Sequence, residues 1–278
     1  MFHVKRWLLL ALALPAFGWG VGLEVRFPGP GVELVGRLYL PDGAERFPGV
    51  VLLHGCSGLW ARNGAPTRSY QAWAEHLQSR GFAALLVDSF GPRGEREICT
   101  QKQRSISEAV DRPKDAHAAL RWLAARPDIK ADSIHVLGWS NGGTTALHSL
   151  RSDSPGREAE GPHFRSGVAL YPGCAALTRA PYRPKGALLV LAGAADDWTP
   201  ARHCEKLVTD ARLLGATASI EVYEGAHHGF DRVDGTVRRR PDVRNLSSPA
   251  GWGATVGPHP KARAESRERA TRFLEEQR

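Results

Sequence analysis

Several features that would define other classes of protein are absent from this sequence. Its 278 residues contain no run of about 20 apolar residues, so we expect no membrane-spanning helix. There are only four cysteines, with no Cys-x-x-Cys pair and no Cys/His spacing typical of zinc sites. The adjacent His227 and His228 are too close in sequence to form a metal site alone. We therefore expect no metal ion and no cofactor.

Acidic residues are in the minority. The formal net charge is +8, and part of the excess lies at residues 238–240 and in the last predicted helix. No aromatic-interleaved basic patch or nucleic-acid-binding motif accompanies it, so we expect a solvated basic surface and no nucleic-acid partner. A basic surface does favour anionic substrates or an anionic envelope surface.

The first 20 residues have the composition of a secretory signal peptide. Lys5 and Arg6 precede an apolar stretch at residues 7–14, followed by Pro15 and the small-residue segment 16–18. We predict cleavage between residues 18 and 22, which lowers the net charge to +6 and leaves a single domain, 21–278. The alternatives are a short membrane anchor or a buried first helix. Export predicts a periplasmic or secreted protein. The sequence leaves the oligomeric state open.

An exported protein can form disulfides. Four cysteines allow three pairings. Cys56 and Cys99 follow neighbouring strands of the predicted sheet, and so do Cys174 and Cys204. We expect the pairs 56–99 and 174–204.

The pattern of apolar residues predicts an α/β fold. Residues 25–40 alternate apolar and polar positions, as an antiparallel hairpin does. The runs at 50–53, 83–87, 134–137, 168–171 and 187–192 are apolar throughout, which is typical of parallel strands covered on both faces. Helices are expected at 69–80, 108–126, 201–214 and 261–277. These predict a mostly parallel, doubly wound sheet flanked by helices.

Two long segments, 91–107 and 231–260, show no helix or strand pattern and are predicted as loops at the rim of the site. By contrast, the segment 174–185 is short. We therefore predict no large lid and an open, shallow site.

The most informative motif is Gly-Trp-Ser-Asn-Gly at 138–142, which follows the strand at 134–137 and precedes a helix-like stretch at 143–148. A strand, a sharp turn and a helix form the context of a nucleophile elbow, whose glycines avoid steric clashes. We predict Ser140 as the nucleophile. The alternative is a glycine-rich turn with a surface serine.

An acid and a base should follow the serine in this order along the chain. Asp196 and Asp197 come just after the strand at 187–192, and Asp196 is preferred from its spacing. Asp197 would then cap the helix after Pro200. His228 is preferred over His227 as the general base, on the loop after a strand at 220–223.

The oxyanion of an acyl-transfer intermediate needs two backbone N–H donors. Asn141, directly after the nucleophile, is predicted to supply one. The His-Gly-x-x-Gly turn at 54–58 is predicted to supply the other from Cys56, with Ser57 as the alternative.

With these motifs assembled, the chain resembles the dienelactone hydrolase family of α/β-hydrolases from about residue 32 to the last helix. The stretches that carry the resemblance are 54–58, 88–94, 138–143, 171–174, 193–200 and 225–230. The resemblance implies a lidless α/β-hydrolase with the triad at Ser140, Asp196 and His228. One departure is that the name-giving enzymes use a cysteine nucleophile, which puts dienelactone itself in doubt as the substrate.

Arg93 and Arg232 lie on predicted rim loops and are candidates for binding a substrate carboxylate through paired hydrogen bonds. We predict a serine hydrolase that cleaves a small carboxylic ester or lactone through an acyl-enzyme. One alternative is an exported esterase of carbohydrate esters or polyesters. Another is a non-catalytic binding protein on a hydrolase scaffold.

Overall fold

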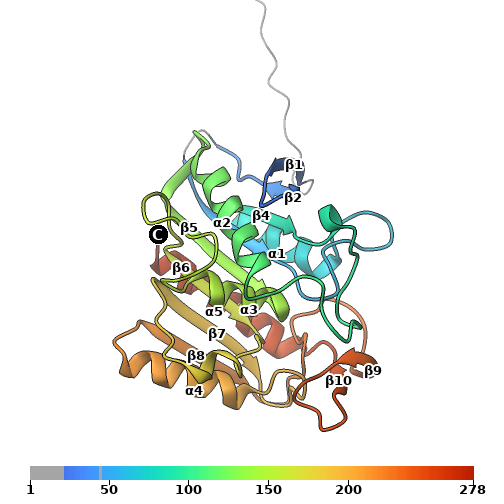
Figure 1. Cartoon of the computed structure of the whole chain (residues 1–278). Coiled ribbons are helices and arrows are strands. Elements are labelled where there is room, and N and C mark those ends of the chain that lie inside the picture. Colours follow the sequence, from blue (N-terminus) through green and yellow to red (C-terminus); the bar gives the residue numbers. More distant parts are fainter. Residues whose placement is uncertain (1–21, 44–45) are drawn as a thin grey trace, which may run out of the picture.

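The computed structural model describes residues 22–43 and 46–278, in which a central sheet has helices on both faces (Figure 1). The predicted signal peptide, 1–20, lies outside the described residues. The eight strands of the sheet are β1 (Leu23–Pro28), β2 (Glu33–Tyr39), β3 (Phe47–Leu53), β4 (Ala83–Asp88), β5 (Ile129–Trp139), β6 (Ser166–Leu170), β7 (Ala187–Gly193) and β8 (Ala218–Tyr223). They lie in the order β1-β2-β4-β3-β5-β6-β7-β8.

The sheet is mostly parallel, as predicted. β1 and β2 form the expected antiparallel hairpin, and β2 is also antiparallel to β4. All neighbours from β4 to β8 are parallel. Strands β4, β6 and β7 are buried at every residue, which explains why their sequences are apolar without alternation.

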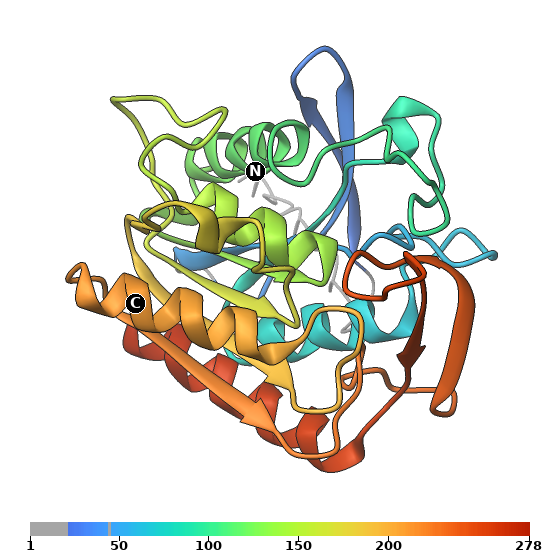
Figure 2. The same ribbon diagram turned by 60° about the horizontal axis from the view of Figure 1, so that its bottom comes forward.

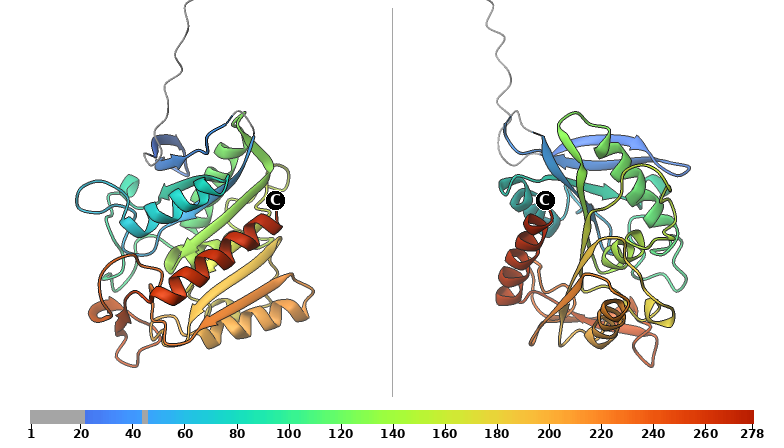
Figure 3. Two further views of the ribbon diagram at one scale, coloured as in Figure 1. Left: turned by 180° about the vertical axis from the view of Figure 1, so that it is seen from behind. Right: turned by 90° about the vertical axis from the view of Figure 1, so that its left-hand side faces the viewer.

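Helices cover the two faces separately (Figure 3). α2 (Asp111–Ala124), α3 (Asn141–Ser149) and α4 (Ala201–Leu213) lie on one face, and α1 (Arg68–Ser79) and α5 (Pro260–Glu276) lie on the other. Successive residues of β3 alternate between the two cores: Val51 and Leu53 pack with α2–α4, and Val50 and Leu52 with α1 and α5.

The strand order places the site. From β3 the chain moves first to β4 on one side and then to β5 on the other, so β3 and β5 are neighbours whose helices lie on opposite faces. In open α/β sheets this topological switch opens a crevice at the carboxyl ends of the strands. His54 follows β3 at this edge, and Ser140 follows β5.

The prediction of an irregular loop at 231–260 is wrong. The segment forms a two-stranded antiparallel sheet of β9 (Arg238–Arg244) and β10 (Trp252–Val256), seen in dark orange and red in Figure 2. The sequence of β9 hides it, because most of its side chains are polar and exposed. Val243 of β9 and Ala254 of β10 are buried in a small cluster with Phe90, Cys56 and Cys99.

The remaining connections agree with the predictions. The segment between β6 and β7 contains one short 3-10 helix, η2 (Leu177–Arg179), and no large lid. Segment 91–107 begins with another short 3-10 helix, η1 (Gly91–Arg93), and is otherwise irregular. Both predicted disulfides, Cys56–Cys99 and Cys174–Cys204, are present. Among the residues that the structure describes, no helix is long and apolar enough to cross a membrane.

Candidate active site

Ser140 sits on a strained turn between β5 and α3. Its φ of 53° and ψ of −117° lie in a region that non-glycine residues rarely occupy. A Cβ on Gly138 would lie 2.1 Å from the carbonyl oxygen of Gly142, and a Cβ on Gly142 would lie 1.9 Å from that of Leu53. The two glycines of the motif are therefore sterically required, as predicted for a nucleophile elbow.

Three of the predicted residues form a continuous chain of hydrogen bonds. The Oγ of Ser140 lies 2.8 Å from Nε2 of His228, and Nδ1 of His228 lies 2.8 Å from Oδ2 of Asp196. These partners set the roles of the two ring nitrogens: Nδ1–H donates to the carboxylate, and in the uncharged imidazole Nε2 accepts from the serine hydroxyl. The side chains come from the ends of β5, β7 and β8, far apart in sequence.

The carboxylate of Asp196 is buried and held in place. Its Oδ1 accepts the backbone N–H groups of Trp198 and Thr199, both at 2.9 Å, and its Oδ2 accepts the Thr199 hydroxyl. Burial alone would raise the pKa of this carboxyl. The charge on His228 and the hydrogen bonds from His228 and Thr199 outweigh burial, so the pKa of Asp196 is lowered.

The alternatives for acid and base lie elsewhere. Asp197 accepts hydrogen bonds from the backbone N–H and hydroxyl of Thr255 on β10 and pairs with Arg239 at 3.5 Å. It does not cap α4, because that helix begins after Pro200 without a side-chain cap, so this prediction is wrong. The Nδ1 of His227 bonds to the carbonyl of Ala195.

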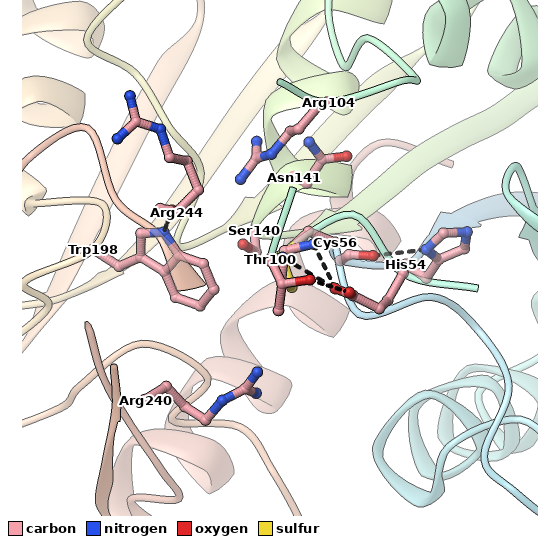
Figure 4. The surroundings of a disulfide bond; sticks show 12 residues. His54, Cys56, Thr100, Arg104, Ser140, Asn141, Trp198, Arg240 and Arg244 are labelled. Carbon is pink, nitrogen blue, oxygen red and sulfur yellow. Dashed lines mark hydrogen bonds between the residues drawn. A yellow bond between two sulfur atoms is a disulfide. The ribbon is translucent and has the colours of Figure 1, made fainter. Parts of the chain in front are cut away.

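The two predicted oxyanion donors lie beside Ser140 (Figure 4). A Cβ on Gly55 would lie 3.6 Å from the Cβ of Ser140, so the 54–58 turn packs against the serine. Cys56 and Ser57 line the same cavity as Ser140 and His228. Asn141 is the first residue of α3, where a backbone N–H has no carbonyl partner within the helix.

Arg112 on α2 is a residue that the sequence analysis missed. It is fully buried, and its guanidinium donates to the carbonyl of His54 at 2.8 Å and to the side-chain oxygen of Asn141. Burial lowers its pKa to about 10, which still leaves it charged at neutral pH. It occupies the same helical stripe as the buried Ala116 and Leu120, and a charge in an apolar stripe could have revealed it.

A second buried charge, Asp231, was also missed. Its carboxylate accepts hydrogen bonds from the indoles of Trp73 and Trp139, both at 2.8 Å, and from the hydroxyl of Tyr171 at 2.6 Å. Burial raises the pKa of Asp231 despite these bonds. Trp139 directly precedes Ser140, and the Tyr171 ring packs edge-on against His228 at 4.8 Å. Asp231 therefore fixes the aromatic residues next to Ser140 and His228.

The two predicted substrate arginines have different surroundings. Arg93 donates two hydrogen bonds to the buried carboxylate of Asp115, at 2.8 and 2.9 Å, and one to the carbonyl of Ser89. It does not line the cavities at Ser140, so the structure does not place it at the site. Arg232 does line the cavity that contains Ser140 and His228.

Ser140 and Trp198 line two cavities. The first, of about 530 Å³, includes His228, Cys56 and Arg232, and the second, of about 450 Å³, includes Asn141. Trp198 is fixed by a hydrogen bond from its indole to the carbonyl of Arg244. The β9–β10 segment borders both cavities, a wall that the prediction of an open, shallow site did not include.

A doubly wound sheet with a serine on a strained strand-to-helix turn defines the α/β-hydrolase class. The family model for the dienelactone hydrolase family matches residues 34–277, and the chain belongs to this family. Its membership supports hydrolysis of a carboxylic ester or lactone.

Individual relatives of the chain share a quarter or less of its residues. A Bradyrhizobium protein described as a probable 2-oxo-3-(5-oxofuran-2-ylidene)propanoate lactonase is 25% identical over 240 residues, covering 81% of this chain and 88% of that protein. Esterase 2 of Thermogutta terrifontis superposes with a TM-score of 0.67 at 18% identity, over 93% of this chain and 96% of that one. A dienelactone hydrolase-like promiscuous phosphotriesterase, P91, from metagenomic libraries gives 0.63 at 18% identity, over 92% and 97%. These structures establish similarity of fold.

Proposed function

We propose that the protein is a serine hydrolase that cleaves a small carboxylic ester or lactone through an acyl-enzyme. The observation that carries this proposal is the unbroken chain of 2.8 Å hydrogen bonds from Asp196 through His228 to the hydroxyl of Ser140. A serine hydroxyl needs such a base to become nucleophilic at neutral pH. The family and the lactonase relative support the substrate class.

In the first half of the reaction, the Oγ of Ser140 attacks the carbonyl carbon while Nε2 of His228 takes the hydroxyl proton. The carbonyl oxygen becomes an oxyanion, stabilised by the N–H groups of Cys56 and Asn141. As the intermediate collapses, the bond from carbon to the alcohol oxygen breaks, and His228 gives that oxygen the proton. Asp196 keeps the imidazole oriented and stabilises its charged form.

In the second half, water replaces the alcohol. His228 takes a proton from water, and the resulting hydroxide attacks the acyl carbon. When the bond to Ser140 Oγ breaks, the proton returns to the serine and the carboxylic acid leaves. Arg232 is proposed to bind a polar group of the substrate in the first cavity, which it lines together with His228.

We also propose that the protein acts in the periplasm or outside the cell. The signal-like composition of residues 1–20 supports export, and two disulfides that use all four cysteines suit an oxidising compartment. Trapping the free thiols of protein from the cell envelope and from the cytoplasm would test this, with oxidised mature protein expected only in the envelope or the medium.

The first experiment is labelling with a fluorophosphonate, followed by intact mass and peptide mapping. A single adduct on Ser140, absent in Ser140→Ala, is expected, together with turnover of aryl esters or lactones. Circular dichroism should show the same fold for both proteins. A folded wild type that neither forms the adduct nor turns over any activated ester would overturn the proposal in favour of a binding protein.

A further inference from the structure

The nucleophile lies where the two cavities meet, and this bears on the shape of the substrate. Ser140 and Trp198 are in the walls of both, whereas His228 lines only the first. An open-chain ester has two arms on its carbonyl carbon, the acyl arm and the alcohol arm. A site between two cavities can hold one arm in each.

The position of the base assigns the arms. In the proposed function, on which this inference rests, the departing alcohol oxygen receives its proton from Nε2 of His228. The alcohol arm must therefore lie on the side of His228, in the first cavity. The acyl arm is left with the second cavity, which is lined by Asn141, Thr144 and Thr199 next to the serine.

The charged side chains of the second cavity are mostly cationic. Lys102, Arg104 and Arg244 line it, against a single carboxylate, Glu108. Histidine side chains add no negative charge to the cavity. Burial lowers the pKa of His148 to about 4, so that side chain is neutral at pH 7. The excess positive charge in a concave site favours an anionic group.

Arg104 carries a buried N–H group that has no partner among the residues that the structure describes. Its Nε is shielded from solvent and has no hydrogen-bond partner within the described part of the chain. Its nearest carboxylate contact is a long one, 3.4 Å to Glu108. A buried N–H without a partner costs free energy, which an acceptor on a ligand would recover. Figure 4 shows Arg104 and Arg244 on one side of Trp198 and Arg240 on the other.

We infer that the second cavity binds the acyl arm of an ester, and that this arm carries an anionic group, such as a carboxylate, at the end away from the reacting carbonyl. Arg104 and Lys102 bind that group. The substrate is then a half-ester of a dicarboxylic acid or an acyl group of similar charge, with the alcohol arm in the first cavity.

The test compares two aryl esters that differ in one charge, 4-nitrophenyl hydrogen adipate and 4-nitrophenyl hexanoate. In adipate the free carboxylate is too far along the chain to attack its own ester through a five- or six-membered ring. We expect wild type to favour adipate in kcat/KM, and Arg104→Gln to lower the adipate-to-hexanoate ratio about tenfold or more, since a hydrogen bond to a charged group is lost. Lys102→Gln should lower the ratio in the same direction.

Arg212→Gln is the matched control. Arg212 is exposed near the end of α4 and lines neither cavity, so its loss changes the net charge equally and should leave the ratio unchanged. A third probe, the butyrate ester of 4-hydroxybenzoate against phenyl butyrate, places the charge on the alcohol arm.

Two results would overturn the inference while leaving the proposed function intact. One is turnover of hexanoate and adipate at equal kcat/KM by an enzyme that still forms the Ser140 adduct. The other is a preference for the charge on the alcohol arm that Arg104→Gln abolishes. Absence of both turnover and adduct would instead count against the proposed function.

Discussion

Arg112 donates a hydrogen bond of 2.8 Å to the backbone carbonyl of His54, a residue 58 positions earlier in the chain. The same guanidinium bonds to the side chain of Asn141. Arg112 therefore connects the two loops from which the proposed oxyanion donors come. Because both donors must point at one oxygen, the position of each loop relative to the other is decisive.

Replacing Arg112 by Met should lower kcat by about 10- to 100-fold and leave KM within a few-fold, since the connection acts on transition-state stabilisation. Arg112→Lys keeps the charge but replaces the two guanidinium nitrogens that make these bonds by a single nitrogen, so an intermediate kcat is expected. Steady-state kinetics on protein shown to be folded by circular dichroism measures this. A folded Met variant with normal kcat would show that Arg112 has only a structural role.

Replacing Asp196 by Asn should reduce kcat by about four orders of magnitude, because the histidine loses the partner that sets its tautomer. Asp197→Asn is the control, since its carboxylate bonds to Thr255 on β10 and not to His228. Its kcat should stay within a few-fold of wild type. If Asp197→Asn gave the larger loss, the order of roles would be reversed.

The two disulfides should differ in their effect on activity but not in their effect on stability. They close loops of similar length, with sequence separations of 43 and 30, so each should stabilise by about 4 kcal/mol on the loop-entropy model. Cys56, however, lies on the turn that packs against Ser140 and is proposed to supply an oxyanion donor. Cys174 lines the second cavity and Cys204 lies on α4, and neither supplies a proposed oxyanion donor. Cys56→Ser/Cys99→Ser should lower both kcat and the melting temperature.

The matched variant Cys174→Ser/Cys204→Ser should lower the melting temperature and change kcat little. Calorimetry and initial rates below the melting transition separate the two effects. Equal losses of kcat in both variants would contradict a local role of Cys56–Cys99 at the oxyanion loop.

Acid should destabilise the fold before its carboxylates are protonated. Burial, with a smaller contribution from the charge of Arg165, lowers the pKa of His135 to about 3, and burial lowers that of His117 to about 4. In the unfolded chain the pKa of each of these histidines is about 6.5. Below that pH the unfolded state binds more protons, so the free energy of unfolding falls by up to about 1.4 kcal/mol per pH unit for each histidine.

Urea denaturation between pH 7.5 and 4.5 measures this slope. The loss should begin as the pH falls below about 6.5 and continue toward the folded-state values, and His135→Asn should remove one histidine's share of it. An unchanged slope in that folded variant would mean that His135 does not contribute.

Much of the fold and site was predicted from sequence because the relevant signals are local. Fully apolar strands and the Gly-x-Ser-x-Gly turn each depend on a few adjacent residues. Asp196 and His228 were each predicted from their position just after an apolar or alternating strand. The disulfide pairing followed from the order of the strands and is confirmed.

Other features depend on contacts between distant segments, and only the tertiary structure decided them. Arg112 and Asp231 are charged residues whose burial is possible because partners from other elements satisfy them. Arg93 is bound to Asp115, a pairing that its position on a rim loop did not reveal. The β9–β10 strands form although β9 is polar, because Val243 and Ala254 pack onto the Cys56–Cys99 region. Sequence periodicity indicates which side of an element is buried. Which element packs against that side depends on contacts between segments that are distant in sequence, and these form only in the folded chain.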